Sequence, residues 1–214
     1  MNNSNFQSQT ARWRFWLPLV LQLGLILLIP AQASWTRAFG TSVILQTAPV
    51  DPYDLFRGYY VTLNYNISQQ QTLSTLDGWE NWIAEQATPT DLSGPLPQQV
   101  TFYLTLQAPA ETNTQPPQPW QPIAISGDRP TQLRANQVVL KGIATPPPSA
   151  GPRSRWLYGL ERYYIPEDQR QDINDRIQTA QAEQPEQFLV EVSVNRQGEA
   201  VPTQIWIQGQ AYRF

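Results

Sequence analysis

The sequence predicts a mainly β (α+β) protein: an N-terminal transmembrane helix, then one antiparallel β-sandwich or barrel-like domain with one or two short helices. Three observations lead to this fold class: an apolar run near the N-terminus, two-residue alternation of apolar and polar side chains from Thr41 onward, and frequent breaks at Pro and Gly. A chain of 214 residues has room for one ordinary domain and a membrane segment. We therefore expect residues 41–214 to form a single exported β domain.

The first element is a hydrophobic helix that follows a short polar tail. The 22 steps from Trp13 to Trp35 span roughly 33 Å at about 1.5 Å per residue, which matches a hydrocarbon core with an aromatic residue at each edge. The pattern predicts a signal-anchor helix over residues 15–33, preceded by a cytoplasmic tail over residues 1–14. A cleaved signal peptide is the alternative, because Ala31-Gln32-Ala33 resembles an A-x-A cleavage site that would start the mature chain at Ser34.

The flanking cations predict the orientation of this helix. Arg12 and Arg14 precede it, whereas Arg37 alone follows closely. Cations concentrate on the cytoplasmic side of membrane helices, so we expect a single-pass protein of the cell membrane whose C-terminal domain lies outside the cytoplasm. The absence of cysteine agrees with an oxidising compartment.

Composition removes several classes of function. The chain has no His and no Cys, so Ser-His-Asp and Cys-His nucleophile systems, Cys/His zinc sites and disulfides are excluded. A net charge of -3 argues against nucleic-acid binding, which needs a basic face. We assign no catalytic residue, no metal and no cofactor, and we favour a protein that is not an enzyme.

The body of the chain consists mainly of short alternating segments. In residues 59–67, odd-numbered side chains are apolar or aromatic and predict one half-buried strand with its odd positions inward. Residues 188–194 and 201–207, joined by an Asn195-Arg196-Gln197-Gly198 turn, predict a hairpin. The other expected strands are residues 42–47, 99–107, 123–125, 138–143 and 156–165.

Helices and Pro-rich loops complete the expected organisation. Residues 79–87 are a short helix candidate, and residues 166–185 show helical spacing after an N-terminal Pro-Glu-Asp signal. Three segments are too rich in Pro for regular structure and are expected as hairpin connections: residues 88–97, 109–122 and 146–152.

One motif joins turn chemistry to the strand at residues 59–67. In the run Asp51-Pro52-Tyr53-Asp54-Leu55-Phe56-Arg57-Gly58-Tyr59-Tyr60-Val61-Thr62-Leu63-Asn64-Tyr65, Asp-Pro starts a turn, Gly58 can adopt a positive φ, and Arg57 can pair with a carboxylate. This run resembles the GDYXXLXY protein family through Gly58, Tyr60, Leu63 and Tyr65, with Tyr59 where the family has Asp. A second block over residues 159–167, GLERYYIPE, is similar to a later element of the same family.

The resemblance implies a membrane-anchored exported domain with no assigned reaction, in members often encoded beside a multi-spanning membrane protein. We therefore expect a membrane-bound interaction or accessory module, with an integral membrane protein as a possible partner. In this interpretation the motif residues Gly58, Tyr60, Leu63 and Tyr65 are structural. Their neighbours Asp51, Asp54, Arg57 and Glu161 form a hypothetical binding cluster, or lock the turn instead.

Two alternatives remain at this point. In the first, the chain is a carboxylate-dependent hydrolase of the cell envelope that uses Asp51 or Asp54 together with Glu161. In the second, its numerous tryptophans form a glycan-binding platform, although aromatic residues also build the core of such a domain. These tryptophans are Trp79, Trp82, Trp120, Trp156 and Trp206.

Overall fold

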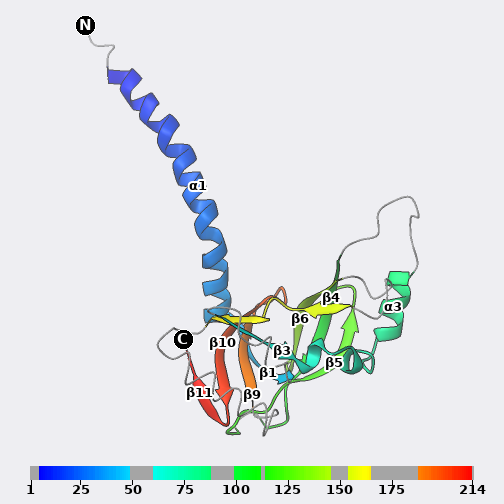
Figure 1. Ribbon diagram of the computed structural model, residues 1–214. Coiled ribbons are helices and arrows are strands. Elements are labelled where there is room, and N and C mark those ends of the chain that lie inside the picture. The colour runs from blue at the N-terminus through cyan, green and yellow to red at the C-terminus, as the bar shows by residue number, and fades with distance from the viewer. Residues whose placement is uncertain are drawn as a thin grey trace.

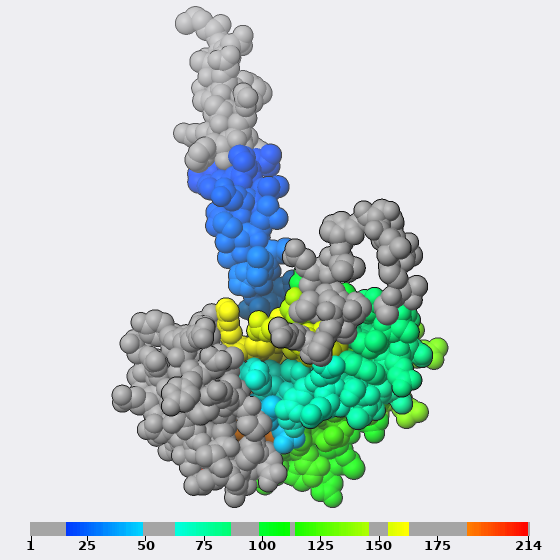
Figure 2. Space-filling view, turned by 45° about the vertical axis from the view of Figure 1, so that its right-hand side comes forward, coloured from blue at the N-terminus to red at the C-terminus, as the bar shows by residue number. Residues whose placement is uncertain are grey.

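The computed structural model (Figure 1) describes residues 5–48, 60–87, 99–111, 114–145, 154–164 and 188–213. It has a long N-terminal helix and a β domain built mainly from two antiparallel sheets, which confirms the predicted fold class. The helix stands clear of the domain and meets it only at its C-terminal end (Figures 1 and 2).

Helix α1 covers Asn5–Phe39 and is longer at both ends than the expected residues 15–33. Its segment Trp16–Phe39 is long and apolar enough to cross a membrane. Most apolar side chains between Trp16 and Ile29 are exposed, because the β domain does not pack on this part of the helix. A helix with an apolar surface on all sides is suited to lipid rather than to water.

The β domain follows α1 directly. Its strands are β1 (Thr41–Ala48), β2 (Tyr60–Thr62), β3 (Asn64–Tyr65), β4 (Val100–Gln107), β5 (Gln121–Ser126), β6 (Gln137–Thr145), β7 (Arg155–Leu157), β8 (Arg162–Tyr164), β9 (Phe188–Val194), β10 (Ala200–Ile207) and β11 (Gln210–Tyr212). Short helices are η1 (Asn66–Ser68), α2 (Gln70–Leu73) and α3 (Trp79–Ala87). Helix α3 confirms the expected helix at residues 79–87, whereas the expected helix at residues 166–185 lies outside the described residues.

The strands form a five-stranded sheet in the order β11-β10-β9-β1-β3 and a four-stranded sheet in the order β5-β4-β6-β7. A two-stranded ladder of β2 and β8 links the two sheets along the chain. Strand β2 leads into β3 of the five-stranded sheet, and β8 follows β7 of the four-stranded sheet. On the other side, the backbone N–H of Lys141 in β6 donates to the carbonyl of Gly198 at 2.8 Å, which joins β6 to the β9–β10 turn. The arrangement is therefore barrel-like, with the two sheets connected along both sides.

A single apolar core fills the space between the sheets. Buried aromatic rings gather around Phe102 of β4, which contacts Trp82, Trp156 and Tyr158 with ring centroids 5.2 to 5.8 Å apart. Such tilted and edge-on contacts are the favoured geometry for aromatic pairs. In this domain without disulfides, large aromatic side chains supply much of the buried apolar surface.

The structure corrects two expected strands. Residues 59–67 do not form one continuous strand: β2 ends at Thr62, β3 covers only Asn64–Tyr65, and η1 follows. The break exists because β2 pairs with β8 while β3 pairs with β1, so the chain turns from one sheet to the other at Leu63. Its inward face was predicted correctly, since Leu63, Tyr65 and Ile67 are all buried.

The expected strand at residues 156–165 is likewise divided, into β7 and β8. Gly159 has a φ of +76°, a left-handed conformation that suits glycine and turns the chain between the two strands. Of the three Pro-rich loops, residues 109–122 connect the antiparallel strands β4 and β5 as expected, although β5 already begins at Gln121. The loops at residues 88–97 and 146–152 lie outside the described residues.

The predicted C-terminal hairpin of β9 and β10 is confirmed. Asn195 holds the turn, because its Oδ1 accepts the backbone N–H groups of Gln197 at 2.9 Å and Glu199 at 3.0 Å. The register shifts between Pro202 and Gln204. Pro202 has no N–H group to donate to the neighbouring strand. A strand tolerates proline at such an irregularity, because the regular hydrogen bonding is already interrupted there.

Candidate functional site

The two sequence blocks that resemble the GDYXXLXY family lie against each other in the structure. Strand β2 pairs with β8, with Tyr60 opposite Tyr164 and Thr62 opposite Arg162. The pairing continues one step further, because the backbone N–H of Leu63 donates to the carbonyl of Glu161 at 2.9 Å. We call this contact, formed by residues 60–67 and 158–164, the motif corner.

Two buried tyrosines fasten the motif corner in opposite directions. The Tyr65 hydroxyl donates to the carbonyl of Leu160 at 2.8 Å, and the Tyr158 hydroxyl donates to the carbonyl of Ile67 at 2.6 Å. All four residues are buried. Each hydroxyl thus supplies a hydrogen bond to a buried carbonyl. Removing either hydroxyl would leave that carbonyl without this donor and would lower the stability of the fold.

The motif residues that the structure describes lie in the core or in a strand ladder. Leu63 and Tyr65 belong to the core, and the backbone of Tyr60 lies in the β2–β8 ladder. Gly58 and Tyr59 lie outside the described residues. The structural role that the sequence assigns to Gly58 therefore stays a prediction.

Glu161 is the one member of the hypothetical binding cluster that the structure describes. Its Oε1 accepts the backbone N–H of Tyr158 at 2.5 Å, so the carboxylate holds the turn between β7 and β8. Asp51, Asp54 and Arg57 lie outside the described residues. The cluster stays a prediction, and the structure places Glu161 beside Leu63, the residue that follows β2.

Tyr158 is a described ionisable group with a strong pKa shift. Burial, and secondarily the negative charge of Glu161, raise the pKa of its hydroxyl well above the ordinary value of about 10. Both causes disfavour a phenolate inside the motif corner. The hydroxyl therefore keeps the proton that it donates to Ile67.

The described residues offer few other chemical groups for a site. No cluster of three or more Asp or Glu side chains suited to a metal ion occurs among them. Trp82 and Trp156 are buried in the core and present no exposed platform. A recess outside the motif corner occurs where α1 meets the β domain.

At this recess, which we call the helix junction, the last turn of α1 is fixed to the β9–β10 hairpin by buried polar contacts. Thr36 is only 3% exposed, although it belongs to a helix that is otherwise almost fully exposed. Its carbonyl accepts hydrogen bonds from the Ser193 hydroxyl at 2.6 Å and from the Gly40 N–H at 2.9 Å. Glycine is required at position 40, because a Cβ there would lie 2.3 Å from Ser193 Oγ and 2.6 Å from the Thr36 carbonyl oxygen.

Side chains extend this contact along the helix. Glu199 Oε2 accepts from Gln32 Nε2 at 2.6 Å and from Asn195 Nδ2 at 3.0 Å, and Asn195 Nδ2 also lies 3.2 Å from Thr36 Oγ1. A groove of about 1000 Å³ opens beside these contacts. Its lining includes Trp35, Phe39, Arg129, Leu133 and Arg196.

Sequence reasoning did not find the helix junction. Its hydrogen bonds join residues 157 to 167 positions apart, and no local pattern announces them. Gly40, at the boundary between helix and strand, was the only available signal. A glycine after a helix is common, however, and does not by itself indicate docking.

The fold and these contacts define a class: a β domain carried on, and fixed to, a helix of membrane-spanning length. Within that class, the chain belongs to the GDYXXLXY protein family, whose sequence pattern matches residues 22–205. The match includes the second half of α1, the helix junction and both blocks of the motif corner. Comparisons with curated proteins and with solved structures gave no significant match.

Removing the Tyr65 hydroxyl should destabilise the domain. In Tyr65→Phe the Leu160 carbonyl loses its buried donor, which should lower the free energy of unfolding by about 1 to 3 kcal/mol. The matched control is Tyr103→Phe, because Tyr103 is half-buried and its hydroxyl makes no hydrogen bond in the described structure. Thermal unfolding of both variants in detergent is the measurement, and equal melting temperatures would contradict a structural role for the Tyr65 hydroxyl.

Tyr158 should make stability depend on alkaline pH. The folded pKa is raised, so the stabilisation is complete below about pH 10, where the unfolded chain also keeps the proton, and falls as the pH rises toward the folded pKa. The free energy of unfolding should decline by up to about 1.4 kcal/mol per pH unit from this group. Tyr158→Phe lacks the ionisable hydroxyl. Its free energy of unfolding, measured with denaturant, should therefore rise relative to that of the parent above about pH 10. Parallel pH profiles of the two proteins would refute the assignment.

Proposed function

We propose that this protein is a single-pass membrane protein whose β domain lies against the outer surface of the cell membrane and serves as an interaction or accessory module for an integral membrane protein. The helix junction carries the proposal. A domain that only needed a tether could hang from a flexible linker, whereas here buried hydrogen bonds fix the last turn of α1 to β9. A fixed connection determines which face of the domain a membrane partner meets.

The sequence supports the orientation and the kind of partner. Arg12 and Arg14 before the apolar segment favour a cytoplasmic N-terminus. An uncleaved helix is favoured over a signal peptide, because cleavage after Ala33 would separate Gln32 from Glu199 and leave the junction incomplete. A multi-spanning membrane protein is the partner that the family resemblance implies.

Within this proposal, Asp51, Asp54, Arg57 and Glu161 bind the partner. The lead-in segment precedes Tyr60 in the sequence, and β2 pairs with β8 of the block that contains Glu161, so the cluster residues flank the same two-stranded ladder. Glu161 itself lies opposite Leu63, at the end of β2 away from the lead-in. The hydrolase alternative receives less support, since one carboxylate oxygen of Glu161 already accepts a backbone N–H group. A general acid or base needs a carboxylate that is free to exchange its proton.

Photo-crosslinking in native membranes tests the proposal. A photoreactive residue at Asn64, an exposed position of the motif corner, should give a discrete adduct with an integral membrane protein. Gly40→Ala should weaken this adduct, because the new methyl group displaces the helix junction. Gly24→Ala is the matched control, since nothing lies within 4 Å of the Cβ that it adds.

The outcomes separate the parts of the proposal. Extraction of the chain by alkaline carbonate would show that α1 is no anchor. A chain that stays in the membrane but yields no membrane-protein adduct would show that the partner assignment is wrong. An adduct of equal yield in Gly40→Ala and Gly24→Ala would remove the role given to the fixed junction.

Arg57→Ala distinguishes a binding role of the cluster from a turn-locking role. If Arg57 binds the partner, the adduct should be lost while the melting temperature changes little, because binding groups commonly add little stability. If it locks the turn, stability and adduct should fall together, since a carboxylate loses its charged donor. Thermal unfolding and crosslinking of the same preparation are compared, and a variant unchanged in both would contradict either role.

A further inference from the structure

We propose that the groove at the helix junction is a binding seat for an anionic phospholipid of the outer leaflet, with the phosphate held by Arg129 and Arg196 and the upper acyl chain lying against Trp35, Phe39 and Leu133. This inference rests on the membrane-spanning role of α1 that is proposed above. It adds a ligand of defined chemistry to a groove that the partner hypothesis leaves unused.

The level of the groove relative to the membrane follows from the length of the helix. The 19 steps from Trp16 to Trp35 correspond to about 28 Å, close to the roughly 30 Å of a bilayer core. Both side chains are exposed, as interfacial tryptophans are. Thr36 follows immediately and is already buried against the β domain. The domain therefore begins where the hydrocarbon core ends, and the groove opens at the level of the lipid headgroups.

The dimensions of the groove suit that layer. On the helix side its lining runs from Gln32 to Phe39, which is about 10 Å along the axis. The polar layer on one side of a bilayer is about 5 to 8 Å thick. The groove thus spans from the outermost acyl carbons through the headgroup region.

One wall of the groove is apolar and uncovered. Trp35 and Phe39 lie one helical turn apart with ring centroids 4.4 Å from each other, and they are 67% and 70% exposed. Across the groove, Leu133 is 38% exposed. Such a group of large apolar side chains is unfavourable in water but favourable against the first methylenes of an acyl chain.

The other part of the lining is basic. Arg129 comes from the connection between β5 and β6, and Arg196 comes from the β9–β10 turn; Arg129 Nη2 donates to the Arg196 carbonyl, which holds its guanidinium at the turn. Glu199 is the one acidic residue of the lining, and its carboxylate already accepts from Gln32 and Asn195. Two arginines against one engaged carboxylate favour an anionic group, and guanidinium geometry favours phosphate.

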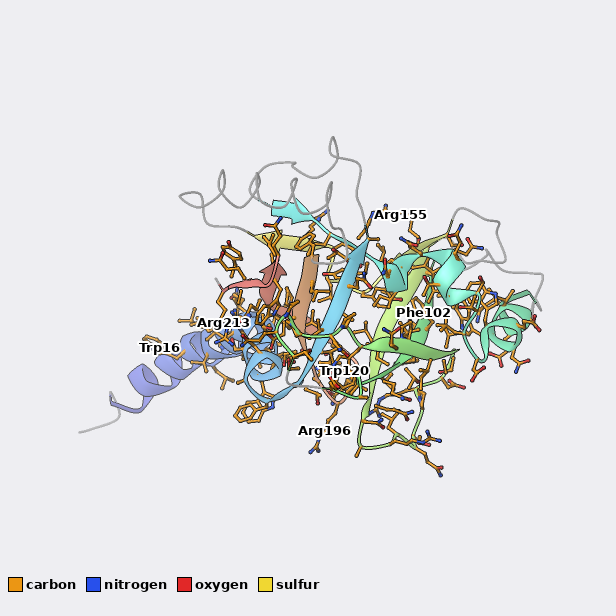
Figure 3. The ribbon with its side chains drawn as sticks, turned by 90° about the horizontal axis from the view of Figure 1, so that it is seen from below. Trp16, Phe102, Trp120, Arg155, Arg196 and Arg213 are labelled. Atoms are coloured by element: carbon orange, nitrogen blue, oxygen red, sulfur yellow. The ribbon has the colours of Figure 1, made fainter. Side chains whose placement is uncertain are left out.

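These features together select a phospholipid. A phosphate alone would leave the apolar wall in water, and an apolar ligand would leave the arginines without a counter-charge. An anionic phospholipid at this depth presents both chemistries in the required order, with its phosphate above its acyl chain. Arg155 supplies a built-in comparison, because it lies on the opposite side of the domain from Arg196 (Figure 3) and is also exposed to solvent.

Native mass spectrometry of the full-length chain in detergent tests the proposal. Phosphatidylglycerol and phosphatidylcholine with identical acyl chains are titrated in turn. The parent chain should prefer phosphatidylglycerol, and each arginine should contribute about fivefold to that preference. Arg129→Gln/Arg196→Gln should abolish the preference, whereas Arg155→Gln should retain it. A parent chain without preference, or a double variant that keeps it, would overturn the proposal.

Three further measurements keep the result interpretable. The melting temperature of the double variant shows whether the fold is intact. If the double variant does not fold, the single variant Arg196→Gln takes its place. It keeps the backbone carbonyl that Arg129 contacts and should lose part of the preference for phosphatidylglycerol. Competition with glycerol phosphate should leave the bound lipid in place; displacement at equal concentration would assign the site to a free anion and overturn the lipid seat. Carbonate extraction tests the anchor separately, so failure of the lipid seat in a membrane-bound chain leaves the proposed function standing.

Discussion

The rest of the β domain depends on the closure of its two sheets at the motif corner. The chain passes from one sheet to the other at Leu63, and a second passage between β7 and β8 faces it. Such corners expose backbone groups that the ladders no longer pair. Here the hydroxyls of Tyr65 and Tyr158 donate across the corner to the carbonyls of Leu160 and Ile67. The family motif is thereby explained where it is described: its Leu and final Tyr close the barrel-like fold.

A second constraint is the direct continuation of α1 into β1. Only Gly40 separates the helix from the strand, and its N–H completes the last helical turn by donating to Thr36. The same Thr36 carbonyl accepts the Ser193 hydroxyl from β9. Since β9 is the neighbour of β1 in the sheet, the helix is held both through the chain and across the ladder. This double attachment resists bending at Gly40 better than a single covalent link would.

Sequence reasoning predicted features that depend on neighbouring residues and missed those that depend on contacts distant in the sequence. Alternation predicted the β9–β10 hairpin, because each residue's face depends on its neighbours and the turn closes locally around Asn195. The same alternation predicted the inward face of residues 59–67 but could not predict the break at Leu63. The break arises because β2 pairs with β8, 100 to 104 positions away, while β3 pairs with β1. The lead-in residues Asp51, Asp54 and Arg57 stay sequence predictions. The helix junction had no local pattern at all, since its partners meet only after the sheet has formed.

Strand β1 connects the two sites. It begins at Thr41, beside the helix junction, and near its other end Thr47 pairs with Tyr65 of the motif corner. Six steps of extended strand separate these residues, about 20 Å. Because β1 is paired on one side by β9 along nearly its whole length, this distance is fixed by the sheet and not by a linker. A membrane partner that contacts the motif corner would thus meet it at a fixed distance from the helix junction. A displaced helix junction should therefore disturb partner contacts at the motif corner even if every residue of that corner is intact.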